Sequence, residues 1–416
     1  MATTTTTQKQ RPDSALIHAA IVIIVGVLAT TLAQTQLLGR LPLQNLLKNE
    51  LHADRTANAA FFFWVGLPWY FKPFAGILTD AFPLLGSRRR SYILISAGLG
   101  TLAWYGLAFT PHDYSKLLYV SLVINTFMVV ASTVVGGYMV EVAQANSGSG
   151  RLAAVRNFVQ QACYIINGPV AGTLASIAFG WTAAACGSIL FLLVPATVFF
   201  LKEQKRYTDS DILLAGAYSQ LGKIASARTM WAAAGLSALF YLAPGLATAT
   251  FYRQQNELHM NTEAQGLLQF LSGIAGVSAA LAYGYACRHW NLRRLLQVCL
   301  LIATVANVAY VLYTTPERAR IIETFNGFGY TLAELALMDL AIRATPAGSE
   351  GLGFSLMMSV RNLALFGTDW FGSRLMDQFH IGYNSLVYAN TATTLMTVPL
   401  VLLLPKLIVG RRDAQA

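Results

Sequence analysis

The chain has 416 residues, of which 55% are hydrophobic and only 12% are charged. Soluble domains carry about 25% charged residues, so this composition leaves too little polar surface for a soluble globule of this size. The net charge of +10 comes from short Lys and Arg clusters between apolar runs. This pattern is typical of membrane protein loops, and it argues against a nucleic-acid-binding protein.

The sequence contains no motif that is typical of a metal site or a nucleotide-binding site. The four cysteines form no CxxC pair, and the six histidines show neither HxH nor HxxxH spacing. We therefore expect packing roles for the cysteines, no bound metal and no cofactor. The phosphate-binding pattern GxxxxGK[ST] is also missing from the sequence, which argues against ATP-driven transport within this chain.

Apolar runs of membrane-spanning length follow one another along the chain. The polar segment 1–14 is predicted to be a disordered cytoplasmic N-terminus, and the first apolar run is too long for a signal peptide. A span needs about 20 apolar residues. The sequence predicts twelve such helices, at residues 15–38, 58–80, 91–110, 116–140, 152–177, 181–201, 229–252, 263–287, 293–314, 319–342, 352–376 and 383–408.

The longest polar interval between these helices is 202–228. It predicts a cytoplasmic linker between an N-terminal six-helix bundle, 15–201, and a C-terminal six-helix bundle, 229–408, followed by a cytoplasmic tail, 409–416. Two repeated halves are typical of secondary transporters. Most Lys and Arg residues fall on the side of the termini and the linker. The positive-inside rule therefore predicts a multi-pass protein of the inner membrane with both termini in the cytoplasm.

The loop between the second and third predicted helices is a candidate gate. A carboxylate at a helix end can pair with arginines and face the positive N-terminus of a neighbouring helix. In the alternative interpretation, the arginines only fix the topology. The predicted gate residues are Asp80, Arg88, Arg89, Arg90, Glu141 and Arg151.

The second predicted helix contains a lysine between two prolines, Pro68 and Pro73. A lysine in hydrocarbon costs about 2.5–3.5 kcal/mol on insertion scales, so it is kept mainly where it faces helices, water or a ligand. Lys72 would suit an anionic substrate, and the rings of Trp69 and Tyr70 would stack on a flat heterocycle. The alternative is a kinked packing helix with a lysine that snorkels to the interface.

Predicted helices 10 and 11 carry a second group of polar residues within spans: Glu334, Arg361, Asn362 and Asp369. Charges at such positions are expected to face the protein interior. Arg361 and Asn362 are predicted to contact the substrate, whereas Glu334 and Asp369 are candidates for proton coupling. A structural salt bridge is the competing interpretation for these charges.

Together these residues resemble the folate–biopterin transporter family of the major facilitator superfamily. The segment Leu67–Tyr92, LPWYFKPFAGILTDAFPLLGSRRRSY, is similar to the family's run of Leu-Pro-Trp, Lys-Pro, Asp and an Arg-rich loop. Val140-Glu141 and Ser359-x-x-Asn362 resemble two further motifs of the family. One departure is the missing aspartate shortly before Val-Glu, in the segment 131–137, which bears on substrate or proton handling.

The resemblance implies an all-α integral membrane protein with twelve transmembrane helices in two six-helix bundles of the major facilitator type. It implies a secondary transporter, not an enzyme, that moves a folate, a pterin or a related anionic heterocycle by alternating access, with proton symport as a further expectation. The expected partners are this small molecule, protons and the lipid bilayer, without nucleic acid, and the expected state is a monomer. The alternatives are transport of another solute (a nucleoside-like cofactor, a peptide or a drug) and a non-transporting receptor or assembly factor on the same fold.

Overall fold

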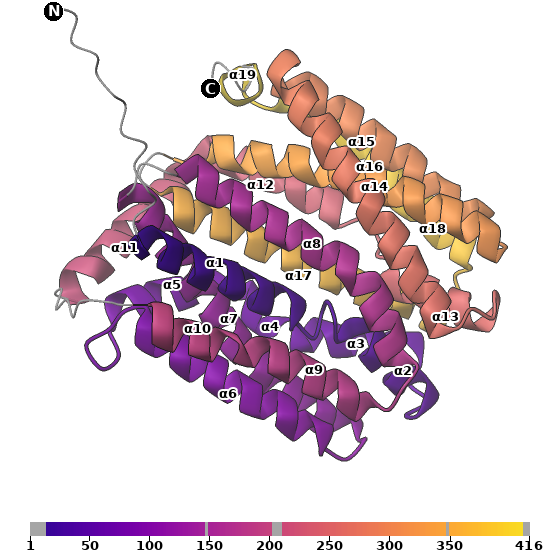
Figure 1. The fold of residues 1–416 in the computed structure, drawn as a ribbon. Coiled ribbons are helices and arrows are strands. Elements are labelled where there is room, and N and C mark those ends of the chain that lie inside the picture. The colour runs from indigo at the N-terminus through magenta and orange to yellow at the C-terminus, as the bar shows by residue number, and fades with distance from the viewer. Residues whose placement is uncertain (1–13, 146–148, 202–209, 347–348, 411–416) are drawn as a thin grey trace, which may run out of the picture.

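The computed structural model describes residues 14–145, 149–201, 210–346 and 349–410. Long helices run along one shared direction and make up most of this part of the chain (Figure 1). Below, the N-terminal half means residues 14–201 and the C-terminal half means residues 210–410. The predicted terminal segments 1–14 and 409–416 lie almost wholly outside the described residues.

The helices of the two halves follow in chain order. The N-terminal half contains α1 (Ser14–Leu32), α2 (Arg40–Asn49), α3 (Arg55–Val65), α4 (Leu67–Tyr70), α5 (Lys72–Ala81), α6 (Arg90–Ala108), α7 (Tyr114–Ala145), α8 (Ser149–Ala175), α9 (Phe179–Phe191) and α10 (Leu193–Phe200). The C-terminal half contains α11 (Ser210–Ser226), α12 (Arg228–Tyr241), α13 (Ala247–Asn256), α14 (Thr262–His289), α15 (Leu292–Val308), η1 (Ala309–Leu312), α16 (Pro316–Ala344), α17 (Glu350–Gln378), α18 (Tyr383–Leu400), η2 (Val401–Leu403) and α19 (Lys406–Val409). The predicted linker 202–228 therefore includes a helix, α11.

The first, second and seventh predicted helices are among those that are interrupted instead of continuous. The first stops at Leu32 and resumes as α2, the second divides into α3, α4 and α5, and the seventh divides into α12 and α13. Pro68 and Pro73 explain the second case, because proline lacks the N–H that a helix needs. At the third break, Gly245 lies so close to α17 that a Cβ there would be 2.4 Å from the Cα of Asp369.

Six helices within the described ranges are long and apolar enough to cross a membrane: Arg90–Ala108, Tyr114–Val142, Phe179–Phe200, Thr262–His289, Leu292–Leu312 and Tyr383–Leu403. The other predicted spans correspond to α1–α2, the α3–α5 segment, α8, α12–α13, α16 and α17. These are interrupted or carry charged residues such as Lys72, Arg361 and Glu334. The structure therefore shows a multi-pass membrane protein with several less apolar helices, and twelve spans remain a prediction.

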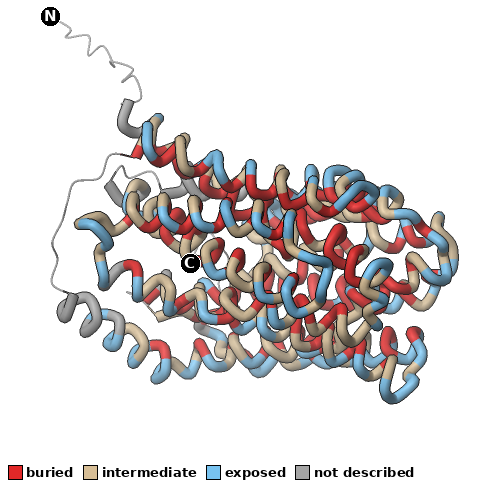
Figure 2. Tube along the Cα trace, turned by 90° about the horizontal axis from the view of Figure 1, so that it is seen from below, coloured by how far each residue is buried: buried red, intermediate tan, exposed pale blue. Residues whose placement is uncertain are grey.

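Apolar side chains form two main buried clusters. One runs from Val22 to Leu201 and takes in only three residues of the C-terminal half, whereas the other lies within Ile224–Val409. Many large apolar side chains are exposed as well, as on a surface that faces lipid. Figure 2 shows buried and exposed residues alternating along single helices, so each helix has one face toward its neighbours and one toward the surroundings.

The two halves meet along α8 with α14 and along α17 with the α3–α5 segment. The first contact is tightest at one end, where a Cβ on Gly168 would lie 2.5 Å from the carbonyl oxygen of Gly266. We call this the outer end, because the sequence predicts that it faces away from the cytoplasm. Figure 1 shows α8 and α14 converging toward α13 and diverging toward their other ends. The halves are therefore in close contact at the outer end.

Candidate functional site

A polar cavity of about 640 Å³ lies between the two halves. The N-terminal half contributes residues 36–44 and α8 to its lining, and the C-terminal half contributes residues 240–254, α14, α15, η1, α16, α17 and α18. A volume of this size is typical of small-molecule sites, which occur preferentially between domains. The charged lining residues are Arg40, Glu323, Glu334, Arg361 and Asp369.

Arg361 and Glu334 form an ion pair in the wall of this cavity. Nη2 of Arg361 contacts Oε1 of Glu334, which joins α17 to α16. Nη1 of Arg361 donates a hydrogen bond to Oδ1 of Asn362 at 3.0 Å, and its guanidinium lies 5.4 Å from the centre of the Tyr241 ring. The sequence predicted all three of these α16 and α17 residues as site residues, and the structure places them together.

Several polar atoms of the cavity wall have no hydrogen-bond partner among the described residues. A buried polar group costs free energy unless it is paired, and a bound molecule is one way to pair it. Both donors and acceptors are present in the set, which favours a ligand with both kinds of group. These atoms are Nε2 of Gln36, Nε2 of Gln44, Oδ1 of Asn167, Nε of Arg361 and Oδ1 of Asn390.

Lys72 points toward α7 and not toward Arg361. Its Nζ donates to Oγ of Ser132 at 3.1 Å and lies 5.1 Å from the Trp69 ring centre. No carboxylate of the described chain lies within ion-pair distance of this ammonium group. Neither Lys72 nor Trp69 lines the cavity between the halves. The two predicted cations are therefore not brought together in this conformation, and a ligand shared by both remains a prediction.

The predicted stacking residues Trp69 and Tyr70 are buried and used in packing. Nε1 of Trp69 donates to Oδ1 of Asn125 at 2.8 Å, and the hydroxyl of Tyr70 donates to the carbonyl oxygen of Phe63 at 2.9 Å. Oγ of Ser359 donates to the carbonyl oxygen of Trp69 at 3.3 Å, so α17 contacts the kinked second helix. Their predicted role in ring stacking is not visible in this geometry and remains a prediction.

Asp369 holds the start of α13 across the break in the seventh predicted helix. Its two carboxylate oxygens accept hydrogen bonds from the N–H of Thr248 at 2.9 Å and from the Thr248 hydroxyl at 2.7 Å. A carboxylate at this position satisfies helix N–H groups and favours the positive end of the helix. Nη2 of Arg40, from the other half, lies 3.6 Å from Oδ2 of Asp369. This geometry gives Asp369 a structural role beside its predicted part in proton coupling.

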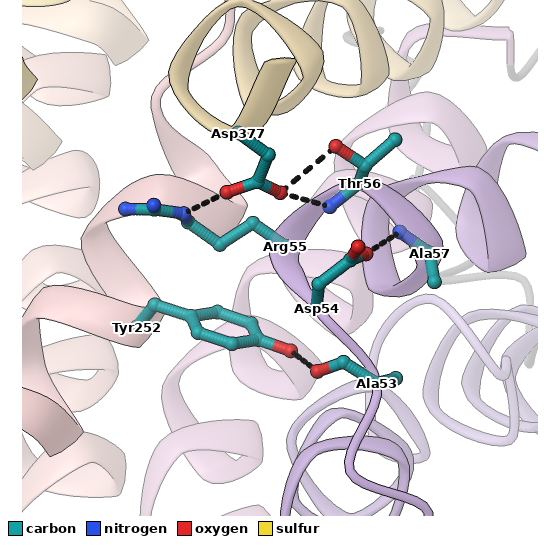
Figure 3. A network of polar contacts seen from close by, with 7 residues as sticks. All are labelled: Ala53, Asp54, Arg55, Thr56, Ala57, Tyr252 and Asp377. Carbon is teal, nitrogen blue, oxygen red and sulfur yellow. Dashed lines mark hydrogen bonds and ion pairs between the residues drawn. The ribbon is translucent and has the colours of Figure 1, made fainter. Parts of the chain in front are cut away.

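A set of polar contacts joins the halves at the outer end (Figure 3). Oδ1 of Asp377 accepts from Nε of Arg55 at 2.8 Å, and Oδ2 accepts from the N–H and the hydroxyl of Thr56 at 2.9 and 2.8 Å. The Tyr252 hydroxyl donates to the carbonyl oxygen of Ala53. We call these five residues the outer network. They link the start of α3 to α13 and to the end of α17, beyond the cavity.

The predicted gate residues lie at the opposite end of the molecule. The buried Arg89 donates from Nη2 to Oε1 of Glu141 at 2.8 Å, and Arg90 donates to the carbonyl oxygen of Val198 at 3.3 Å. Both contacts stay within the N-terminal half. The side chains of Asp80 and Arg151 lie outside the described residues. A gate formed by these residues and Arg88 therefore remains a prediction.

Sequence reasoning missed Arg40, Glu323 and the outer network. Arg40 and Arg55 lie between the predicted helices 15–38 and 58–80, in a stretch for which the sequence predicts no helix. The chain instead continues as α2, which is largely buried. The signal that would have indicated a second helical segment is the i, i+3, i+4 spacing of Leu43, Leu46 and Leu47, all of which are buried.

The helical arrangement and the polar cavity between the halves define a membrane transporter with the major facilitator type of fold. The structure is similar to a solved D-xylose-proton symporter, with a TM-score of 0.71 and 12% identity, covering 96% of this chain and 99% of that one. It is also similar to a solved nucleoside transporter, with a TM-score of 0.67 and 11% identity, covering 95% and 99%. At such low identity these likenesses concern the fold.

The chain belongs to the BT1 family, whose sequence profile matches residues 34–415. It is 26% identical over 390 residues to a protein named folate-biopterin transporter from Synechocystis sp., covering 88% of this chain and 78% of that protein. It is 22% identical over 370 residues to folate transporter 1 of Plasmodium falciparum, covering 85% and 72%. The predicted family is confirmed, and the chain is a secondary transporter and not an enzyme.

Proposed function

We propose that this protein moves a folate, a pterin or a related anionic heterocycle across the inner membrane by alternating access. The observation that carries the proposal is the cavity between the halves, which is lined by Arg361 and by side-chain donors and acceptors that have no partner among the described residues. The edge of a pterin ring presents amino, carbonyl and ring-nitrogen groups, and the carboxylates of a folate suit an arginine. The names of the relatives from Synechocystis and Plasmodium support the same class of solute.

Twelve spans with both termini in the cytoplasm are part of the proposal. The interrupted or less apolar helices are α1–α2, α3–α5, α8, α12–α13, α16 and α17, and most of them supply polar residues to the cavity. Such helices fall short of a plain hydropathy threshold because they face a polar interior, and discontinuous helices are a known feature of transporter sites. The division into bundles 15–201 and 229–408 agrees with the separate hydrophobic clusters.

The closed outer end and the diverging opposite ends of the two halves support alternating access. The outer network and the close α8–α14 contact near Gly168 and Gly266 hold the halves together at the outer end. The opposite ends of α8 and α14 diverge in Figure 1. Transport would require the halves to rock, so that the outer contacts break and contacts near Arg89 and Glu141 form at the inner end.

A thermal-shift experiment with the purified protein tests the solute class. A ligand present at 100 times its Kd stabilises the folded state by about 2.7 kcal/mol, so a pterin or a folate should raise the Tm clearly. Gln44→Leu removes an amide nitrogen that has no internal partner, and it should weaken binding about 2- to 10-fold. Arg361→Met is the second test variant, because it removes the arginine of the cavity wall. Arg318→Met, on the exposed start of α16, is its control.

Three outcomes would count against the proposal. A shift with nucleosides but not with pterins or folates would assign another solute to the cavity. Unchanged pterin binding in both Gln44→Leu and Arg361→Met would place the ligand elsewhere. Binding without uptake into proteoliposomes would indicate a receptor on the transporter fold.

A further inference from the structure

Glu323 of α16 is a half-buried carboxylate that lines the cavity on the side of the outer end. Its Oε2 accepts a hydrogen bond from the Tyr310 hydroxyl at 3.0 Å, and its Oε1 accepts one from the Tyr313 hydroxyl at 3.0 Å. Nε2 of Gln254 lies 3.5 Å from Oε1. The two tyrosine rings are stacked, with centres 5.3 Å apart, so both hydroxyl groups reach the same carboxylate.

Glu323 differs from the other two carboxylates of the cavity in its partners. Glu334 is paired with Arg361, and Asp369 is paired with Arg40 and caps α13. An arginine side chain does not lose its proton in proteins, so each of these two carboxylates faces a permanent positive charge. Glu323 has no ion-pair partner in the described part of the chain. It is therefore the cavity carboxylate whose charge the protein leaves uncompensated.

The partners of Glu323 accommodate either protonation state. A tyrosine hydroxyl can donate or accept, and an amide group offers both functions. When the carboxylate gains a proton, its new O–H can donate to the Tyr310 oxygen, provided that the Tyr310 hydroxyl rotates and turns its own O–H toward the cavity that it lines. A neighbouring lysine or arginine has no such freedom, because it can only donate.

The charged and titratable groups packed around this cluster are few. Arg253 of α13 lies 4.4 Å over the Tyr383 ring and pairs with Glu257 at 3.2 Å, so its charge is already compensated. From α18, the Tyr383 hydroxyl is engaged with Thr250 at 2.9 Å. The α14 helix contributes the neutral Gln265, and Arg320 of α16 itself is exposed to the surroundings.

A row of amide side chains connects Glu323 to the other half of the molecule. Oε1 of Gln254 accepts from Nε2 of Gln265 at 3.1 Å, and Oε1 of Gln265 accepts from Nε2 of Gln255 at 3.3 Å. Gln255 in turn donates to Asn45 at 3.2 Å and accepts from Lys48 at 2.8 Å. A change in the hydrogen bonding of the carboxylate can thus reach the contacts that hold the outer end closed.

We propose that Glu323 binds and releases the proton that drives transport, and that its state is passed to the outer end through Gln254, Gln265 and Gln255. In this step a proton from the cavity water bonds to a carboxylate oxygen and gives a neutral carboxylic acid, and the reverse step returns it to water on the other side. The proposal rests on the proposed transport function. It assigns proton coupling to Glu323, which has no arginine partner in the described part of the chain, in place of Glu334 and Asp369.

Infrared difference spectroscopy tests the site without any substrate. Acidification of the purified wild-type protein should produce the C=O stretching band of a protonated, partly buried carboxyl group. Glu323→Gln should lack that band. Glu317→Gln is the matched control on the same helix, because Glu317 is exposed and a backbone hydrogen bond lowers its pKa. A band that persists in Glu323→Gln, or that disappears equally in Glu317→Gln, overturns the proposal whatever the solute is.

Uptake in proteoliposomes tests the coupling. A tenfold inward proton gradient should raise the accumulation of a pterin or folate by up to about tenfold in the wild type, if one proton accompanies each molecule. Glu323→Gln should lose this stimulation but keep exchange of labelled for unlabelled solute without a gradient, since glutamine resembles the protonated acid. Gradient-driven accumulation in Glu323→Gln, or a wild type driven by sodium and not by protons, would refute the assignment. Absence of exchange in the wild type would instead reject the proposed solute, and the infrared result would still decide the proton site.

Discussion

Loss of the Asp377 carboxylate should open the outer end of the molecule. The two oxygens of Asp377 accept three hydrogen bonds from Arg55 and Thr56, which belong to the other half. Hydrogen bonds to charged groups contribute about 1.5–3 kcal/mol each when well buried. Arg55 is 31% exposed and Asp377 is 17% exposed, so solvent screening reduces this figure. We therefore expect about 1–3 kcal/mol for Asp377→Asn, which corresponds to a shift of about 5- to 150-fold toward the outward-open state.

A cysteine in the cavity wall reports this shift. Gln44→Cys, in a background from which the native cysteines are removed, places a thiol in the lining just inside the outer network. A membrane-impermeant thiol reagent added from outside should label it about 5- to 150-fold faster when Asp377→Asn is also present. Asp113→Asn is the control, because Asp113 is an exposed carboxylate that accepts a hydrogen bond from the N–H of Lys116 in its own half.

Restoration of the contact separates its role from a general loss of stability. Exchange of the two charges, as Arg55→Asp with Asp377→Arg, should recover slow labelling at least in part, since an ion pair is again present. Labelling of Asp377→Asn at the rate of the Asp113→Asn control would refute the reasoning. It would mean that the outer end is held by α8 and α14 and not by this network.

Three further predictions concern topology, the gate and the substrate site. Single cysteines at Ser219 and Asn256 should react with an impermeant reagent from opposite sides of the membrane, and reaction from one side would overturn the six-plus-six arrangement. Asp80→Asn should reduce transport strongly while binding persists, because removal of one member of a charge network leaves its partners unpaired; turnover equal to the wild type would remove the gate role. Lys72→Met and Arg361→Met should each weaken binding of an anionic substrate by more than tenfold, measured by titration of the purified variants, and normal binding in both would make these cations structural.

The fold was largely predictable from the sequence, and the reason is visible in particular helices. The apolar runs that gave α6, α7, α14 and α15 are long and sharply bounded, so length alone identified them. The interrupted helices were harder to predict. Pro68 and Pro73 mark the breaks in the second helix, but the first helix stops at Leu32 without a proline in the turn that follows. The leucine spacing of α2 indicates a helical segment there, but the sequence does not show that the chain turns between Leu32 and Arg40.

The candidate site was partly predictable. Arg361 and Glu334 were identified because a charge within an apolar run is costly, and the structure brings them together. Glu323 gave no comparable signal, because it lies only a few residues inside the predicted start of its helix, where a charge can reach water. Its significance comes from Tyr310 and Tyr313, which belong to the segment before α16 and meet it only in the folded protein.

The breaks in the first and seventh helices place two short segments, α2 and α13, beside the cavity at its outer end. Arg40 begins α2, Asp369 caps α13, and the contact between their charges at 3.6 Å joins the halves in the wall of the cavity. Lys48, near the end of α2, contacts Gln255 and Asn256 of α13. The same two segments therefore line the cavity and carry cross-half contacts. Because of this shared position, an anionic group bound to Arg40 would compete with Asp369 for a charge that also joins the halves, which gives solute binding a direct physical route to the opening of the transporter.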